Sequence, residues 1–203
     1  EFDDPYIGMD YYNNTLVDGG VSWTEDDVDE EWKPTLEPGQ YRLRCFNNEF
    51  IGYKSGGVGG QAIENYIDGS QHFNNYCHGF NLFAKISPKG GVHNGVGFYG
   101  PLEYFNNIFI GTSPGSGSGF MAINGDEDTP NTNHFVYNNV VYNTRRTIET
   151  TKNTLYDSEF KNNIFVNIYD VFWNEQGNSS NCLVDNNIIY NLAGDLTSDG
   201  ADV

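Results

Sequence analysis

The chain has 203 residues, a length that suits one domain, and it carries a formal net charge of −18. The charge is uneven, because residues 1–38 hold twelve acidic side chains and one lysine. A surface of this sign repels a phosphate backbone and an anionic lipid surface, so neither nucleic acid nor a membrane surface is expected as a partner. No apolar run approaches the roughly 18 residues that a membrane-spanning helix needs.

Asparagine and glycine stand out in the composition, with 27 and 24 residues. Asparagine prefers turns, and glycine loses the most backbone entropy when it becomes ordered, so both disfavour long helices. Apolar positions show no sustained helical spacing either. We therefore expect short strands separated by turns, with a core supplied largely by the aromatic residues, which make up 15% of the chain.

An Asn-Asn pair followed by apolar residues recurs along the whole chain. In chain order, the second asparagine of each pair is Asn14, Asn48, Asn75, Asn107, Asn139, Asn163 and Asn187. The separations between them are 34, 27, 32, 32, 24 and 24 residues. This spacing fits a solenoid whose minimal unit is interrupted by loops of variable length.

Each unit contains three short extended segments. One segment runs into the Asn-Asn pair and a second follows it directly, as in HFVYNNVVYN and CLVDNNIIYN. The third segments read GVGFYG (95–100), GFMAING (119–125), RTIETT (146–151) and YDVFWNE (169–175). Three strands of about 4–6 residues per unit are what one coil of a three-sided parallel β-helix requires.

The Asn-Asn pair has a physical role at the turn between two such strands. Asparagine adopts the left-handed backbone conformation more readily than other non-glycine residues. Its side-chain amide also donates to and accepts from an identical amide one coil away, at about 4.8 Å. We therefore expect a parallel β-helix with an asparagine ladder. An antiparallel β-sandwich with Asn-rich turns is the alternative.

The repeats FKNNIFVN (160–167) and VDNNIIYN (184–191) resemble those of the right-handed parallel β-helix proteins of the pectate-lyase-like superfamily. The resemblance covers roughly residues 40–192, with Asn14 as a weaker outlying copy. It implies one all-β domain over residues 1–203, a right-handed single-stranded parallel β-helix with one coil for each Asn-Asn pair. The acidic segment 24–38 is then a loop insertion in this domain.

The resemblance also carries expectations about the chain ends and the location of the protein. Neither end of the sequence looks like an amphipathic capping helix, so further coils or another chain are expected there. The first residues show no signal peptide, so any export signal is expected to have been removed or to lie outside the sequence. A secreted, cell-surface or periplasmic protein is implied.

The ligand that the resemblance implies is a polysaccharide. Many members of the superfamily are lyases that act on uronic-acid polymers, and others are glycoside hydrolases, epimerases or adhesins. A lyase needs a base to abstract the proton α to a carboxylate and a positive group, commonly Ca²⁺ or Arg, to neutralise that carboxylate. We therefore expect β-elimination on an acidic polysaccharide. A glycoside hydrolase and a non-catalytic adhesin, carbohydrate-binding or structural solenoid are the alternatives.

Two clusters near the third segments of their coils carry suitable side chains, KISPKGGVHNGVGFYG (85–100) and YNTRRTIETTK (142–152). A base from one coil and an arginine about two coils away would bracket one sugar unit, because two coils span about 10 Å. The candidate catalytic residues are Lys85, Lys89, His93, Arg145, Arg146 and Glu149. Ordinary solvated loop and strand residues are the alternative interpretation for each of them.

The remaining candidates concern substrate and metal binding. Tyr99, Trp173 and Glu175 are the candidate substrate contacts, because aromatic rings stack on sugars. A hydrolase would need two carboxylates about 5–9 Å apart, for which Glu149 and Glu175 are candidates. In GDEDTP (125–130), Asp126 and Asp128 are candidate Ca²⁺ ligands, although their spacing is not that of an EF-hand loop.

Overall fold

The computed structural model describes residues 8–23, 40–52, 60–65, 67, 69–86, 101–112, 119–124, 131–151, 155–174, 181–194 and 197–198. In this part of the chain the backbone forms strands and turns, without a helix. Consequently, none of the described residues belongs to a helix long and apolar enough to cross a membrane. The acidic segment 24–38 lies outside the described residues.

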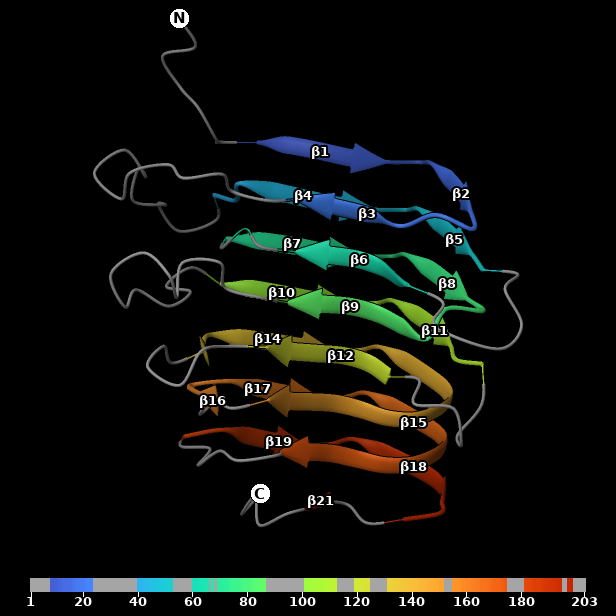
Figure 1. Cartoon of the computed structure of the whole chain (residues 1–203). Coiled ribbons are helices and arrows are strands. Elements are labelled where there is room, and N and C mark those ends of the chain that lie inside the picture. The colour runs from blue at the N-terminus through green and yellow to red at the C-terminus, as the bar shows by residue number, and fades with distance from the viewer. Residues whose placement is uncertain are drawn as a thin grey trace, which may run out of the picture.

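The strands that precede the Asn-Asn pairs stack in one parallel sheet, which we call the first sheet (Figure 1). Its strands, in spatial order, are β1 (Met9–Tyr12), β4 (Leu43–Phe46), β7 (Ser70–Phe73), β10 (Leu102–Phe105), β14 (His134–Tyr137), β17 (Glu159–Lys161) and β19 (Leu183–Asp185). Each strand pairs with the equivalent strand of the next coil, so spatial order follows coil order.

The strands that follow the pairs form the second sheet. They are β2 (Thr15–Val17), β5 (Glu49–Ile51), β8 (Tyr76–His78), β11 (Ile108–Ile110), the first part of β15 (Val140–Thr151), the first part of β18 (Ile164–Asn174) and β20 (Ile188–Leu192). All of these pairings are parallel. The long strands β15 and β18 continue around a corner and join this sheet to the next one (Figure 1).

The third sheet completes each coil. Its strands are β3 (Val21–Trp23), β6 (Gln61–Asn65), β9 (Leu82–Ile86), β12 (Gly119–Asn124), the later parts of β15 and β18, and β21 (Thr197–Ser198). A short parallel pair, β13 (Asn131–Thr132) with β16 (Leu155–Tyr156), lies apart from these sheets. The chain is therefore an all-β parallel β-helix as expected, and the antiparallel sandwich alternative is wrong.

A continuous asparagine ladder runs along the corner between the first and second sheets. The second asparagine of every pair takes part, and the central members are fully or almost fully buried. The Oδ1 atom of Asn107 accepts hydrogen bonds from the backbone N and the Nδ2 of Asn75, both at 3.0 Å. The Nδ2 of Asn107 donates to the Oδ1 of Asn139 at 3.0 Å and to the carbonyl of His72 at 2.9 Å.

This pattern repeats from Asn14 to Asn187 at the predicted separations. The pair was expected to turn the chain and form the ladder as a unit, and in the structure each residue has one of these two roles. The first asparagine makes the turn, with a φ of 55° at Asn106 and similar values in the other pairs. The second one is the ladder residue. Left-handed backbone and a buried amide are thus separate requirements at adjacent positions.

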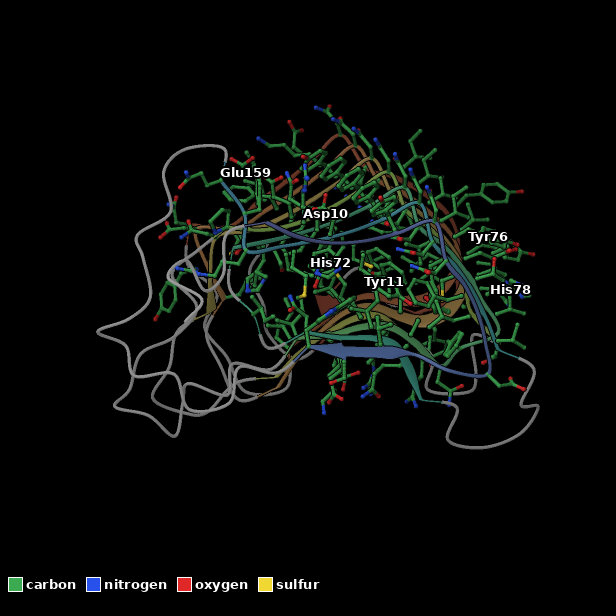
Figure 2. The ribbon with its side chains drawn as sticks, turned by 90° about the horizontal axis from the view of Figure 1, so that it is seen from above. Asp10, Tyr11, His72, Tyr76, His78 and Glu159 are labelled. Carbon is green, nitrogen blue, oxygen red and sulfur yellow. The ribbon has the colours of Figure 1, made fainter. Side chains whose placement is uncertain are left out.

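The interior of the coil is filled by apolar residues that point inward from all three sheets. The largest fully buried side chains include Phe50, Phe83, Phe109, Phe120 and Phe165. Seen along the stack, side chains occupy the space enclosed by the ribbon, and His72 and Tyr11 point into it (Figure 2). His72 and His134 are completely buried, and the His72 ring stacks on Tyr104 at 4.6 Å between centroids.

A second aromatic stack lies on the outer side of the first sheet, immediately before the Asn-Asn corner. Its members are Tyr12, Phe46, Phe73, Phe105 and Tyr137. Neighbouring centroids are 4.8–5.1 Å apart and neighbouring planes are within 6° of parallel. Because each inner ring covers the faces of its neighbours, this stack stabilises the parallel register and leaves ring edges to the solvent.

The corner between the second and third sheets is built differently in the early and late coils. In the early coils it contains glycine: Gly79 has a φ of 77°, and a Cβ there would lie 2.0 Å from the carbonyl oxygen of Gly52. In the late coils asparagine takes this corner with a similar φ, at Asn143, Asn167 and Asn191. The Nδ2 of Asn167 donates to the Oδ1 of Asn143 at 2.7 Å, and that of Asn191 donates to Asn167 at 2.9 Å.

The two residues of one Asn-Asn pair should differ in how strongly their substitution lowers stability. Asn107→Ala removes a buried amide that serves four polar groups, so we expect the free energy of unfolding to fall by about 3–5 kcal/mol. Asn106→Gly keeps a residue that accepts positive φ and should change it by less than about 1 kcal/mol. Urea-induced unfolding measures both values. Equal losses for the two variants would contradict the division of tasks.

The two buried histidines should make the protein sensitive to acid. Burial lowers the pKa of His72 and of His134 to about 3. Below the ordinary value of about 6.5 the unfolded chain binds more protons, so stability is lost as the pH falls from there toward 3. The loss is about 1.4 kcal/mol per histidine per pH unit, and above about pH 7.5 these two groups contribute none.

Urea-induced unfolding at pH 7.5, 6 and 5 tests this expectation. The double variant His72→Phe, His134→Leu keeps a ring against Tyr104 and should lose much less stability on acidification than the parent chain. His78→Gln, at an outward-facing imidazole, is the control and should follow the parent. An unchanged acid response in the double variant would show that carboxylates alone cause it.

Candidate functional site

The outward face of the third sheet holds the predicted site residues that the structure describes. Strand register places Glu64, Lys85, Ala122, Glu149 and Trp173 side by side on five successive strands. We call these five positions the charged row. Successive members are separated by one coil, or about 4.8 Å. Lys85 and Glu149 therefore lie two coils apart, with Ala122 between them.

Around Glu64 and Lys85 of this row, the usual alternation of inward and outward side chains along a strand is interrupted. In β9, the side chains of Phe83, Ala84 and Ile86 are buried, whereas Leu82 and Lys85 are partly exposed. Strand β6 shows the same pattern of burial. Two consecutive inward residues thus separate the two outward positions of each strand, and the outward positions of β6 are in register with those of β9.

Lys85 is ion-paired with the preceding member of the row. Its Nζ lies 2.9 Å from the Oε1 of Glu64, and the two side chains are 30% and 20% exposed. The other oxygen of Glu64 accepts a hydrogen bond from the Oγ of Ser22 at 3.3 Å. The lysine charge is therefore compensated within the row, on the side away from Ala122.

Arg146 and Glu149 form a second ion pair on β15. The Nη1 atom of Arg146 lies 2.8 Å from the Oε1 of Glu149, and both side chains are mostly covered. Asp170 occupies the position in register with Arg146 on the next strand and is 5% exposed. Arg145 lies beside this pair in sequence and is half-buried.

Strand β12 lies between these two ion pairs and contributes the smallest side chains. Ala122 is in register with Lys85 on one side and with Glu149 on the other. Gly119, three residues earlier, lies between Leu82 and Arg146 in the same way. The outward positions of β12 therefore extend little above the sheet, while longer charged side chains border it on both sides.

Several predicted site residues cannot be placed. Lys89, His93, Tyr99, Asp126, Asp128 and Glu175 all lie outside the described residues. For Trp173, the structure gives its place in the row and not its side chain. Among the described residues, no three His, Cys, Asp or Glu side chains gather closely enough to hold a metal ion.

The sequence analysis missed two features of the outer surface. It did not select Glu64, although the segment QAIEN at 61–65 occupies the same place in its coil as LFAKI at 82–86. The asparagine four residues after the ladder asparagine in NNVVYN, NNIFVN and NNIIYN belongs to the repeat motif, but no role at a second corner was predicted for it. In both cases the signal was equivalence between coils, which becomes visible once the register is known.

Comparison with protein-family models, with curated proteins and with solved structures found no match to this chain. Function is therefore inferred from the residues and from the geometry of the coil surface.

The charged row offers a limited chemistry. It contains an amine and two carboxylates, the guanidinium of Arg146 lies beside it, and each of the two positive charges already has a carboxylate partner. A ligand with its own carboxylate could exchange with Glu64 or Glu149 and take over the pairing. A lysine that acts as a base would first have to leave Glu64.

The Lys85–Glu64 pair should contribute little to folding. A double-mutant cycle with Lys85→Met and Glu64→Gln should give a coupling free energy of about 0.2–1 kcal/mol, because both side chains are partly exposed to water. Urea-induced unfolding of the four proteins measures it. A coupling well above this range would mean that the pair holds the coils together and is not available to a ligand.

Proposed function

We propose that the chain is a carbohydrate-active β-helix protein of the pectate-lyase-like superfamily that binds an extended polysaccharide across the charged row. The observation that carries the proposal is the register that places Lys85 and Glu149 on either side of Ala122. Charged groups two coils apart, with a short residue between them, suit a chain of sugars lying over several coils. A secreted, cell-surface or periplasmic location would bring such a ligand within reach.

An acidic polysaccharide is the ligand class that this row favours. Lys85 and Arg146 are the cations on the two sides of β12, and both hold carboxylates in the free protein. A uronate carboxylate has the same chemistry as the glutamates that now occupy them. Ca²⁺ held by Asp126 and Asp128 is part of the same proposal, because a cation would offset the negative charge of the protein.

Cleavage of that polysaccharide by β-elimination is the second candidate function. It is favoured by the presence of a lysine and an arginine on the same face, since the lysine could abstract the proton and the arginine could neutralise the neighbouring carboxylate. The two ion pairs count against it, because they occupy both groups in the free protein. Simple binding therefore takes precedence.

No described feature favours a glycoside hydrolase. The two carboxylates of the charged row, Glu64 and Glu149, stand three strands apart, or about 14 Å between their backbones. That spacing exceeds the roughly 5–9 Å that hydrolysis requires. Glu175, the proposed partner of Glu149, lies outside the described residues.

One assay separates binding from elimination. The protein is mixed with polygalacturonate, alginate and glucuronate-containing polymers, with and without Ca²⁺, and binding is measured by affinity electrophoresis while ultraviolet absorbance reports unsaturated uronates. Binding without new absorbance supports the first candidate, and absorbance that rises with time supports the second. A chain that neither binds nor cleaves any of these polymers contradicts both.

Lys85→Ala should weaken binding about tenfold or more, because it removes a charge-assisted contact. Lys161→Ala is the matched control: Lys161 forms a 2.8 Å ion pair with Glu159 on the first sheet and is 31% exposed, like Lys85 at 30%. This control should bind as the parent does. Equal losses in the two variants would mean that the polymer responds to overall charge and not to the row.

A further inference from the structure

The outward face of the second sheet carries aromatic and aliphatic side chains in place of the charged side chains of the third sheet. Two parallel rows of outward side chains run along it, and one of them alternates between rings and aliphatic groups. Strand register gives this row as His78, Ile110, Tyr142, Val166 and Tyr190. A ring therefore recurs at every second coil, or about every 10 Å. We call His78, Tyr142 and Tyr190, with the asparagines beside them, the tyrosine face.

The rings of this face are accessible, which distinguishes them from the aromatic stack on the first sheet. Tyr142 is 45% exposed and Tyr190 is 70% exposed. Val166 lies between Tyr142 and Tyr190, so neither tyrosine ring covers the face of the other. At the other end of the row, His78 points away from the core beside Tyr76, and their ring centroids are 5.4 Å apart (Figure 2).

A line of side-chain amides borders the rings along the second corner. Asn143 directly follows Tyr142 in sequence, and Asn191 directly follows Tyr190. Asn167, between them, uses one N–H toward Asn143 and accepts one hydrogen bond from Asn191. A primary amide has a second N–H and a second lone pair, so the hydrogen-bonded line retains capacity for a ligand. Aromatic rings can stack on the faces of sugar rings, and the neighbouring amides can form hydrogen bonds with sugar hydroxyl groups.

The tyrosine face suits an uncharged ligand. From β8 to β20, the outward positions of the described strands in this sheet hold Tyr, His, Ile and Val, without a lysine, arginine, aspartate or glutamate. The chain as a whole carries a charge of −18. A neutral ligand meets no repulsion here, whereas an acidic polymer would gain no compensating cation.

The size of the face argues against a protein partner. The strip is about three residues wide and five coils long, which amounts to an area on the order of 200–300 Å². A stable protein interface buries about 800 Å² on each partner. A second copy of this chain would therefore find too little surface, whereas a linear oligomer that lies along the strip would not need more.

We propose that the tyrosine face binds a neutral, extended polysaccharide of 1,4-β-linked pyranoses, lying parallel to the stack of coils. In such a chain each sugar advances by about one coil, and every second sugar presents the same side. Tyr142 and Tyr190 then stack on alternate sugars, and the amides of the second corner bind hydroxyl groups between them. This site is independent of the charged row, because it lies on a different sheet and takes a ligand of different charge.

Isothermal titration calorimetry with cellohexaose and chitohexaose tests the proposal, with maltohexaose as the α-linked comparison. We expect binding of a β-linked hexasaccharide and none of maltohexaose, whose chain curves away from a straight row. The double variant Tyr142→Ala, Tyr190→Ala should weaken binding about tenfold to a hundredfold, from the loss of two stacking contacts. Tyr142→Phe, Tyr190→Phe keeps both rings and should bind within about threefold of the parent chain.

Two further variants keep the test decisive. Tyr12→Ala removes an equally exposed tyrosine from the first sheet and should leave binding unchanged. Val166→Arg places a long charged side chain between the two rings and should abolish binding even if the alanine double variant fails to fold. Absence of binding to both β-linked hexasaccharides overturns the proposal. So does binding that survives Val166→Arg, or that Tyr12→Ala weakens as much as the alanine pair does.

The proposals for the charged row and for the tyrosine face can be contradicted independently of each other. Lys85→Ala should leave cellohexaose and chitohexaose binding intact, and the alanine double variant should leave polyuronate binding intact. A parent chain that binds a β-linked hexasaccharide but no polyuronate would contradict the proposed function and support the proposal for the tyrosine face.

Discussion

The structure depends on one repeated hydrogen-bonding arrangement: a buried asparagine oxygen that accepts from both the backbone and the side chain of the preceding coil. At Asn107 the two incoming hydrogen bonds are both 3.0 Å long, and the two outgoing ones tie the amide to its neighbours on either side. A buried amide that lost these partners would pay the full cost of an unsatisfied polar group. Each coil is therefore held at the height and angle that its neighbours set.

The rows of side chains on the outer surface repeat at the same spacing as the coils. The rings on the first sheet stack because the coils beneath them repeat at the same interval. The charged row and the tyrosine face are likewise sets of equivalent positions, one from each coil. What distinguishes the faces is the choice of residue at those positions: compensated charges on the third sheet, and alternating rings and aliphatic groups on the second.

Much of the fold could be predicted from the sequence because its key signal is local. The Asn-Asn pair combines a turn residue and a buried amide at adjacent positions, and its recurrence gives the coil length directly. The site was harder to predict. Lys85 and Glu149 could be placed on one face from the repeat, but the pairing of Lys85 with Glu64 depends on a side chain 21 residues away whose role only the register reveals. Candidates between the recurring segments of the sequence, such as His93, have no equivalent in other repeats from which a position could be deduced.

The ladder also separates two properties that are usually linked, loop length and core geometry. Between successive ladder asparagines the chain takes 27 residues in one coil and 32 in another, yet the amide-to-amide distance is 3.0 Å in both. The described strands keep the same parallel register in both coils although the number of residues between them differs. The hydrogen-bonded edges that join one coil to the next are thus the same whatever the number of residues between two ladder asparagines. Loops can be lengthened, shortened or replaced during evolution, or in the laboratory, while the residues on the flat faces keep their places.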